Sequence, residues 1–273
     1  MSGPLGSSQF MYSSGAGAFY SHQINKSMRF DKADATSLKL DLSSAGDRTS
    51  WAFSTWLKFG LLNTSDSGSN GYSTIFGNGR AGQYDYIAFY KTNHHIYWQD
   101  FLGGSSSAYG ITTSQHRDTG GWYHLVWVWD SDDSTQADRS RIYINGNRIS
   151  DYSASRAVNS GDTSDINNSG RDHVIGDSAV GDGKLFDGYL AETIFIDGGT
   201  EDFTAGNFGE TKDGVWIPKD PSGLTFGSNG FHLKYENASD LGNDSSGNNN
   251  DFTAAGLGTD HQVLDSPTIG TGS

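Results

Sequence analysis

Residues 49–60 read TSWAFSTWLKFG, and residues 121–130 read GWYHLVWVWD. In the first stretch the side chains of Trp51, Phe53 and Leu57 fall at alternating positions, so a β-strand places them on one face. In the second stretch apolar side chains occupy both alternating sets, which is typical of a strand covered on both sides. The two stretches therefore predict central strands of a β-sheet with both faces buried.

Shorter runs of the same kind recur along the chain, separated by segments rich in glycine, serine and aspartate. They lie at residues 27–30, 37–42, 73–77, 84–90, 94–100, 173–176, 184–198 and 229–236. Between residues 140 and 150, Asn145-Gly146 supplies the positive φ angles of a two-residue type I′ turn, which predicts a β-hairpin. No repeat of fixed period is present, which disfavours a propeller or a solenoid. The pattern predicts an all-β jelly-roll sandwich of two antiparallel sheets.

The composition of the 273-residue chain fits this class and excludes several others. Glycine is abundant at 37 residues and aromatic residues reach 13%, which suits short strands joined by tight turns. Because cysteine is absent, disulfide bonds, thiolate metal sites and thiol nucleophiles are excluded. The net charge of -14 opposes binding to nucleic-acid phosphates, so no nucleic-acid partner is expected.

The two ends of the sequence differ from the middle. Residues 1–25 are rich in glycine, serine and alanine with interspersed aromatic residues, which predicts an N-terminal attachment arm or a disordered leader. The sandwich is expected over residues 26–240, followed by an irregular C-terminal tail over residues 241–273. The N-terminus lacks the pattern of a signal peptide, and no stretch of about 20 apolar residues predicts membrane insertion.

The strand-forming segments resemble a known family. SMRFDKADATSLKLDL (27–42), TSWAFSTWLKFG, GWYHLVWVWD, RIYINGNRI (141–149) and FDGYLAETIFIDG (186–198) look like successive strands of laminin-G-like, concanavalin A-like lectin/glucanase domains. A second stretch runs from FGETKDG at residue 208 to TAAG at residue 256, followed by HQVLDSPT (261–268). It is similar to segments that accompany such domains in structural proteins of tailed bacteriophages.

This resemblance implies a bacteriophage structural protein on the virion exterior, either a tail-fibre or appendage component or a capsid decoration. Its partners would be other capsid or tail proteins, with a host-surface glycan as a candidate ligand. Symmetric oligomers are common, so a homo-oligomer is expected. Two alternatives remain open: a calcium-assisted carbohydrate-binding adhesin not tied to a virion, and a glycan-degrading enzyme.

The carboxylates of the sequence are the candidates for catalysis. Glycoside hydrolysis needs two of them flanking one bond, and the chain contains four glutamates. Glu192 and Asp197 lie where a glucanase of this class would carry its catalytic strand, but alternation places them on opposite faces. His124, inside an apolar strand, is predicted to be a hydrogen-bonded structural histidine. No catalytic residue is therefore assigned, and the protein is predicted not to be an enzyme.

Two groups of residues are candidates for ligand binding. The loop at residues 243–251 offers oxygen ligands for Ca²⁺, although such a sequence more often forms a turn without an ion. The candidate calcium ligands are Asp244, Asn248, Asn250 and Asp251. Aromatic rings near the loops of the middle region could stack on sugar faces, although sandwiches bury most of their rings. The candidate glycan-binding residues are Tyr84, Tyr86, Trp98 and Tyr109.

Overall fold

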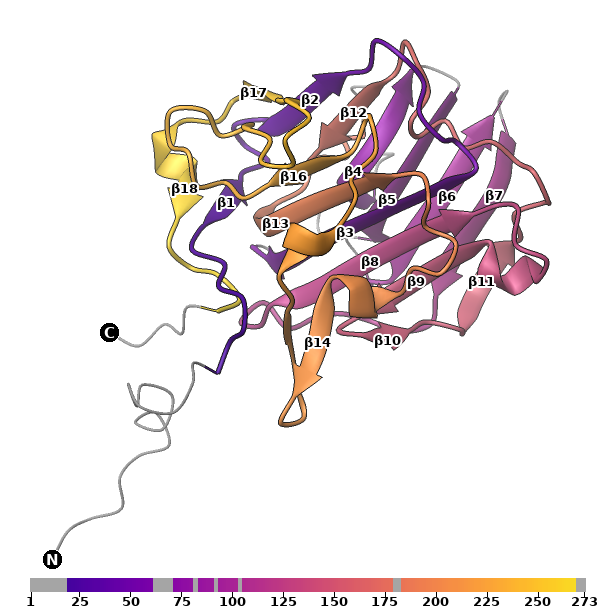
Figure 1. The fold of residues 1–273 in the computed structure, drawn as a ribbon, viewed down its shortest axis with the longest axis horizontal. Helices are drawn as coiled ribbons and strands as arrows, with labels where there is room; N and C mark the ends of the chain where they lie inside the picture. The colour runs from indigo at the N-terminus through magenta and orange to yellow at the C-terminus, as the bar shows by residue number, and fades with distance from the viewer. Residues whose placement is uncertain are drawn as a thin grey trace, which may run out of the picture.

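The computed structural model describes residues 19–60, 71–80, 83–90, 93–102, 105–178 and 183–268. Two large antiparallel sheets form the molecule, and a small hairpin sheet projects beside them (Figure 1). The all-β jelly-roll sandwich predicted from the sequence is confirmed. In these ranges no helix is long and apolar enough to cross a membrane.

Sheet A has the strand order β10-β9-β8-β3-β13-β1-β18, and β16 also pairs with β13. Its strands are β1 (Ser27–Phe30), β3 (Ser50–Phe59), β8 (Tyr123–Asp130), β9 (Ser140–Ile144), β10 (Asn147–Arg148), β13 (Gly188–Asp197), β16 (Phe231–Leu233) and β18 (Gln262–Val263). The central strands β8, β3 and β13 come from the most apolar segments of the sequence, because both of their faces are covered.

Sheet B has the strand order β11-β7-β6-β5-β4-β12-β2-β17. Its strands are β2 (Ser37–Asp41), β4 (Tyr72–Arg80), β5 (Gln83–Tyr90), β6 (Ile96–Leu102), β7 (Ser105–Thr112), β11 (Tyr152–Arg156), β12 (Asp172–Ile175) and β17 (Thr253–Ala255). The third sheet pairs β14 (Gly209–Lys212) with β15 (Val215–Pro218). Short 3₁₀ turns are η2 (Gln136–Asp138), η3 (Ala205–Asn207), η4 (Pro221–Gly223) and η5 (Thr259–His261).

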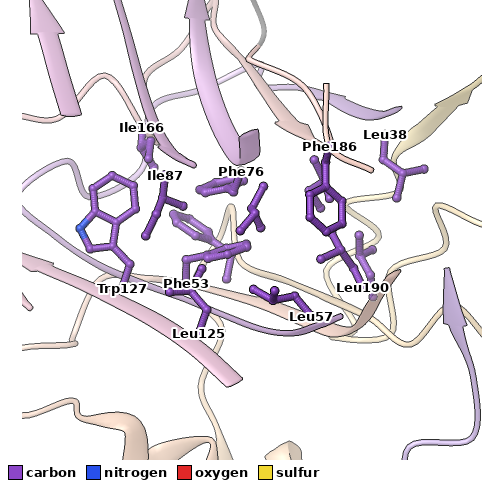
Figure 2. Close-up of a cluster of buried hydrophobic side chains, with 14 of the residues drawn as sticks. Leu38, Phe53, Leu57, Phe76, Ile87, Leu125, Trp127, Ile166, Phe186 and Leu190 are labelled. Carbon is purple, nitrogen blue, oxygen red and sulfur yellow. The ribbon is translucent and has the colours of Figure 1, made fainter. Parts of the chain in front are cut away.

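The core lies between the inner faces of the two sheets, where aromatic and aliphatic side chains pack together (Figure 2). Trp51, Phe53 and Leu57 of β3 belong to it, so the alternation predicted for this strand is confirmed. The outer face of sheet A carries Val126 and Val128, which pack with apolar side chains from residues 203–226. Sheet A is therefore buried on both faces.

The hairpin predicted at residues 140–150 is confirmed. Asn145 and Gly146 have φ angles of 48° and 80°, and β9 pairs with β10 around them. These two positive angles are those of a type I′ turn, whose twist matches that of the flanking strands.

The N-terminal residues that the structure describes lie on the outer face of sheet A. Residues 19–26, here called the N-terminal strap, place Ile24 in an apolar cluster with Trp56 and Ala191. The Ile24 N–H donates to Thr268 Oγ1 at 2.9 Å, so the strap lies against the C-terminal segment. The rest of the expected arm, residues 1–18, lies outside the described residues.

The segment after Leu241 is less irregular than the sequence predicts. Its strand β17 pairs with β2 of sheet B, and its strand β18 pairs with β1 of sheet A. Leu241 and Phe252 are buried in the core between the sheets. Both strands are very short, so their pairing depends on the finished sandwich rather than on a local pattern of alternation.

Candidate functional site

The outer face of sheet B carries a group of aromatic side chains, here called the tyrosine face. It is formed by Tyr72, Tyr84, Tyr86, Tyr90, Tyr97 and Tyr109. These residues come from four consecutive strands, β4 to β7, whose inward positions carry core residues such as Ile87 and Trp98. Alternation along the strands separates the tyrosine rings from the core.

The rings of the tyrosine face contact one another across the strands. Tyr72 stacks on Tyr97 with centroids 5.0 Å apart, and the Tyr72 hydroxyl donates to the Tyr90 hydroxyl at 3.1 Å. Tyr86 is only 2% exposed, whereas Tyr72, Tyr84, Tyr90 and Tyr109 are half-buried. The half-buried rings are therefore the ones that a ligand can reach.

A lysine lies over this face. The Lys184 ammonium is 4.9 Å from the ring centroid of Tyr86, 5.3 Å from that of Tyr84 and 5.6 Å from that of Tyr72. At these distances the ring quadrupoles attract the cation. Lys184 therefore fixes this end of the tyrosine face and gives it positive charge in a strongly acidic protein.

A cavity of about 320 Å³, here called the edge pocket, opens at the edge of the sandwich beside β11 and the β9–β10 hairpin. Aromatic, aliphatic, hydroxyl and basic residues share its wall, and none of the lining residues is acidic. The lining consists of Trp98, Tyr109, Gln136, Ala137, Ser140, Arg148, Ile149, Ser150, Tyr152, Ser155, Arg156, Ala157 and Val158.

The two inner rings of the edge pocket are held in place by the fold. Trp98 is 4% exposed and packs on Trp127 with centroids 6.0 Å apart. A Cβ atom at Gly110 would lie 2.4 Å from Trp98 Nε1 and 2.8 Å from Tyr152 Cε1, so both rings pack closely over this glycine. Burial raises the pKa of Tyr152, and the positive charge of Arg148 opposes that rise.

The four residues predicted to bind glycan are distributed over these two sites. Tyr84, Tyr86 and Tyr109 lie on the tyrosine face, while Trp98 points to the opposite side of sheet B. Trp98 and Tyr109 are both among the residues that line the edge pocket. Sequence reasoning missed Tyr72, Tyr90, Tyr97 and Tyr152. The spacing of Tyr84, Tyr86 and Tyr90 is the signal that could have indicated a tyrosine row, because residues two apart share a strand face.

The four candidate calcium ligands lie together in one turn. The Asp244 carboxylate accepts three backbone N–H hydrogen bonds at 2.8–3.0 Å, and Asp251 accepts one from the Asp244 N–H at 2.7 Å. The side-chain amides of Asn248 and Asn250 both donate to the Gly230 carbonyl. Within the described ranges, no group of three or more acidic or histidine side chains is arranged to hold a metal ion. These contacts stabilise the turn, and calcium binding there stays a prediction.

Glu192 lies at a bulge in β13, with a φ of 47° and a register shift between Ala191 and Ile194. Its Oε1 is 2.7 Å from His22 Nε2 and 3.2 Å from His232 Nε2. Burial raises the pKa of Glu192, but hydrogen bonds with the two histidines outweigh this effect and hold the pKa below its ordinary value. A general acid of a glycosidase needs a raised pKa, so Glu192 does not fit that role.

Asp197, at the end of the same strand, has a separate set of partners. Its carboxylate accepts hydrogen bonds from the Asp47 and Asn229 backbone N–H groups and from the Asn167 side chain. Glu192 and Asp197 are therefore not arranged as a catalytic pair.

His124 has the structural role predicted for it. Trp216 Nε1 donates to His124 Nδ1 at 3.0 Å, and His124 Nε2 lies 2.9 Å from Ser54 Oγ. Burial lowers the pKa of His124 to about 3, so the ring stays neutral at physiological pH. This neutral ring links β8 to Ser54 of β3 and to Trp216, which belongs to the segment of residues 203–226 that covers the outer face of sheet A.

A family model described as the concanavalin A-like lectin/glucanases superfamily matches residues 31–198, which is more than half of the chain. No curated protein matches the chain by sequence.

Solved structures similar to this chain come from several sources. A Bacteroides ovatus protein assigned to carbohydrate binding has 16% identity and a TM-score of 0.55, covering 86% of this chain and 58% of its own. The heptameric SAP-like pentraxin of Limulus polyphemus has 15% identity and a TM-score of 0.45, covering 67% and 82%. Tailspike protein 2 of bacteriophage CBA120 has 11% identity and a TM-score of 0.42, covering 61% and 25%. The similarity to the Bacteroides ovatus protein concerns the fold alone.

Proposed function

Because the chain belongs to the concanavalin A-like lectin/glucanases superfamily, we propose that it is a carbohydrate-binding protein without catalytic activity. Its tyrosine face is the surface that binds glycan. One observation carries this proposal: six tyrosine side chains from four adjacent strands lie together on one face of a sheet. The state of Glu192 supports the absence of catalysis, because its lowered pKa suits a structural ion pair with His22.

The chemistry of the tyrosine face suits sugars. A pyranose ring presents a face of C–H groups that packs on an aromatic ring, and a tyrosine also offers a hydroxyl for hydrogen bonding. Tyrosine side chains have few rotatable bonds, so little conformational entropy is lost when they are fixed by a ligand. A row of rings on a rigid sheet therefore provides repeated, pre-organised contacts for successive sugar units.

The test is a glycan array followed by calorimetric titration of the glycans that bind. Tyr90→Ala should weaken binding roughly tenfold, which corresponds to about 1.4 kcal/mol. Tyr189→Ala is the matched control, because Tyr189 is a half-buried tyrosine on a strand of sheet A. If the array shows no binding, or if Tyr90→Ala binds as well as Tyr189→Ala, the proposal fails.

We also propose that the protein works on the exterior of a bacteriophage virion, as part of a tail appendage or as a capsid decoration. Support comes from the similarity of residues 208–268 to segments of phage structural proteins. Mass spectrometry of purified phage particles from cells that express the chain should detect it as a structural component. Its absence from the particles would overturn this location and leave the glycan-binding proposal intact.

A calcium-assisted mode of binding is a further proposal that the same titrations decide. If Ca²⁺ at the turn around Asp244 supports glycan binding, chelation should weaken it, and Asp251→Asn should reduce the effect of chelation. Equal affinities with Ca²⁺ and after chelation would exclude calcium assistance.

A further inference from the structure

We propose that the edge pocket binds the terminal sugar ring of a glycan chain. This inference rests on the proposed function and adds that the protein recognises chain ends. The pocket and the tyrosine face share strand β7, because Tyr109 belongs to the tyrosine face and is also among the residues that line the edge pocket.

The size and lining of the edge pocket suit a single sugar ring. Its volume of about 320 Å³ lies at the lower end of the range for small-molecule sites. Tyr152 supplies an aromatic ring for the C–H face of a sugar, Trp98 adds the small part of its ring that is exposed, and Ile149 adds aliphatic surface. Hydroxyl groups for hydrogen bonding with the sugar come from Ser140, Ser150 and Ser155.

The pocket wall is fixed before any ligand binds. Trp127 Nε1 donates to Ser140 Oγ at 3.0 Å, which holds this hydroxyl in place. The Arg148 guanidinium forms an ion pair with Asp138 at 2.5 Å and donates to the Ala137 carbonyl at 2.8 Å. Binding therefore requires little ordering of these side chains, which favours affinity.

The inner side of the pocket explains why it would select a chain end. Trp98 and Val158 line the pocket and are also members of the core between the two sheets, where each is at most 4% exposed. A sugar chain that enters the pocket meets this core and cannot continue through it. An internal unit of a glycan, which has neighbours on both sides, would not fit in the same position.

The experiment follows the tryptophan indole N–H signals by NMR. The chain has seven tryptophans, and Trp98→Phe identifies the signal of Trp98. The probes are the methyl glycosides of glucose, galactose, mannose, N-acetylglucosamine and rhamnose. At least one should shift the Trp98 signal, together with that of Trp127 if the sugar contacts Ser140, while the signals of Trp56, Trp122 and Trp216 stay in place.

Two substitutions on β11 and the segment after it separate the possible outcomes. Ala157→Tyr adds a ring at an exposed position of the pocket lining and should abolish the Trp98 shift. Ala154→Tyr is the matched control, an exposed alanine outside the lining, and should leave the shift unchanged.

The outcomes distinguish this inference from the proposed function. If no probe shifts Trp98, or if Ala157→Tyr binds like Ala154→Tyr, end recognition is wrong. The glycan-binding function still stands in that case, provided that Tyr90→Ala weakens binding to array glycans. If glycans on the array do not bind either, both proposals fail together.

Discussion

Two buried carboxyl groups face each other across neighbouring strands of sheet B. Asp85 of β5 is in register with Asp100 of β6, and each is 1% exposed. Asp85 Oδ2 accepts three hydrogen bonds from the segment of residues 164–166, at 2.6–3.1 Å. Burial and then the adjacent charge of Asp85 raise the pKa of Asp100 to about 10. The pair therefore retains a proton at neutral pH.

This raised pKa predicts a stability that falls as the pH rises. In the unfolded chain Asp100 ionises near about 3.9, so above that pH the folded state holds a proton that the unfolded state has lost. Asp100→Asn removes this difference. The variant should gain stability relative to the natural chain as the pH is raised from about 5 to about 9, by about 1.4 kcal/mol per pH unit and up to about 5 kcal/mol in all.

Urea unfolding at several pH values measures the effect of Asp100→Asn. The control is Asp202→Asn, which removes the same charge at an exposed position. Parallel stability curves for the two variants would show that the Asp85–Asp100 pair does not hold a proton.

At the scale of elements, the β9–β10 and β14–β15 hairpins both turn through two residues with positive φ angles, Asn145-Gly146 and Asp213-Gly214. Comparing them separates a steric effect from backbone strain. Gly146 and Gly214 both have a φ of 80°, which disfavours any residue with a Cβ atom. A Cβ atom at Gly146 would lie 2.5 Å from the Trp216 ring, whereas nothing lies within 4 Å at Gly214.

Gly214→Ala should therefore lower the free energy of unfolding by about 1 kcal/mol, through backbone strain alone. Gly146→Ala should lower it by roughly 2–4 kcal/mol, because the collision with Trp216 adds to the strain. Denaturant unfolding of both variants gives the comparison. Equal losses would mean that the Trp216 ring moves aside without cost.

The N-terminal strap is attached through an ion pair whose strength depends on pH. The hydrogen bond with Glu192 raises the pKa of His22, and burial opposes this rise. The negative charges of Glu192 and Asp220 raise the pKa further, the positive charge of Lys234 lowers it, and the net result is a raised pKa. The pKa of Glu192 is held low. The pair contributes most between these two pKa values. It is lost as the pH rises through the raised pKa of His22, and it is lost as the pH falls through the lowered pKa of Glu192.

We therefore expect the strap to be better protected at mildly acidic pH than at alkaline pH. Hydrogen exchange of residues 22–26, corrected for the intrinsic pH dependence of exchange, measures this protection. His22→Ala should remove the pH dependence. His95→Ala should keep it, because His95 directly precedes β6 of sheet B, whereas the strap lies on sheet A. Protection that is the same at both pH values in the natural chain would contradict this account.

The sequence predicted the elements whose pattern is local. Trp51, Phe53 and Leu57 alternate in β3 as expected, and Asn145-Gly146 forms the expected turn. The edge strand β11 was missed because its side chains are largely exposed and show no apolar alternation. The edge pocket could not be predicted for a related reason. Trp98 and Tyr152 meet only because β7 lies between their strands, with a glycine where the two rings pack.

At the scale of the whole molecule, the expected homo-oligomer can be tested directly. Among the described residues, Val215 and Leu264 are the large hydrophobic side chains that are exposed, at 49% and 63%. Leu264 directly follows β18, the last strand of sheet A, and an unprotected sheet edge favours pairing between copies. Analytical ultracentrifugation should show an oligomer that Leu264→Glu weakens and that Ser134→Glu, at an exposed position outside the sheets, does not. A monomer at all concentrations would contradict this expectation.

The pairing of the N-terminal strap with the C-terminal segment also sets how the protein responds to pulling. Ser27 lies opposite Val263 in an antiparallel pair, and Ile24 bonds to Ser266 and Thr268 farther out. Tension applied at residues 22 and 268 would open these contacts one after another, because both strands leave the sheet on the same side. The chain would lengthen at low force before the load reached the central strands. A protein held by both of these segments would thus act as an extensible tether, and sheet B with its tyrosine face would stay folded while the tether gives way.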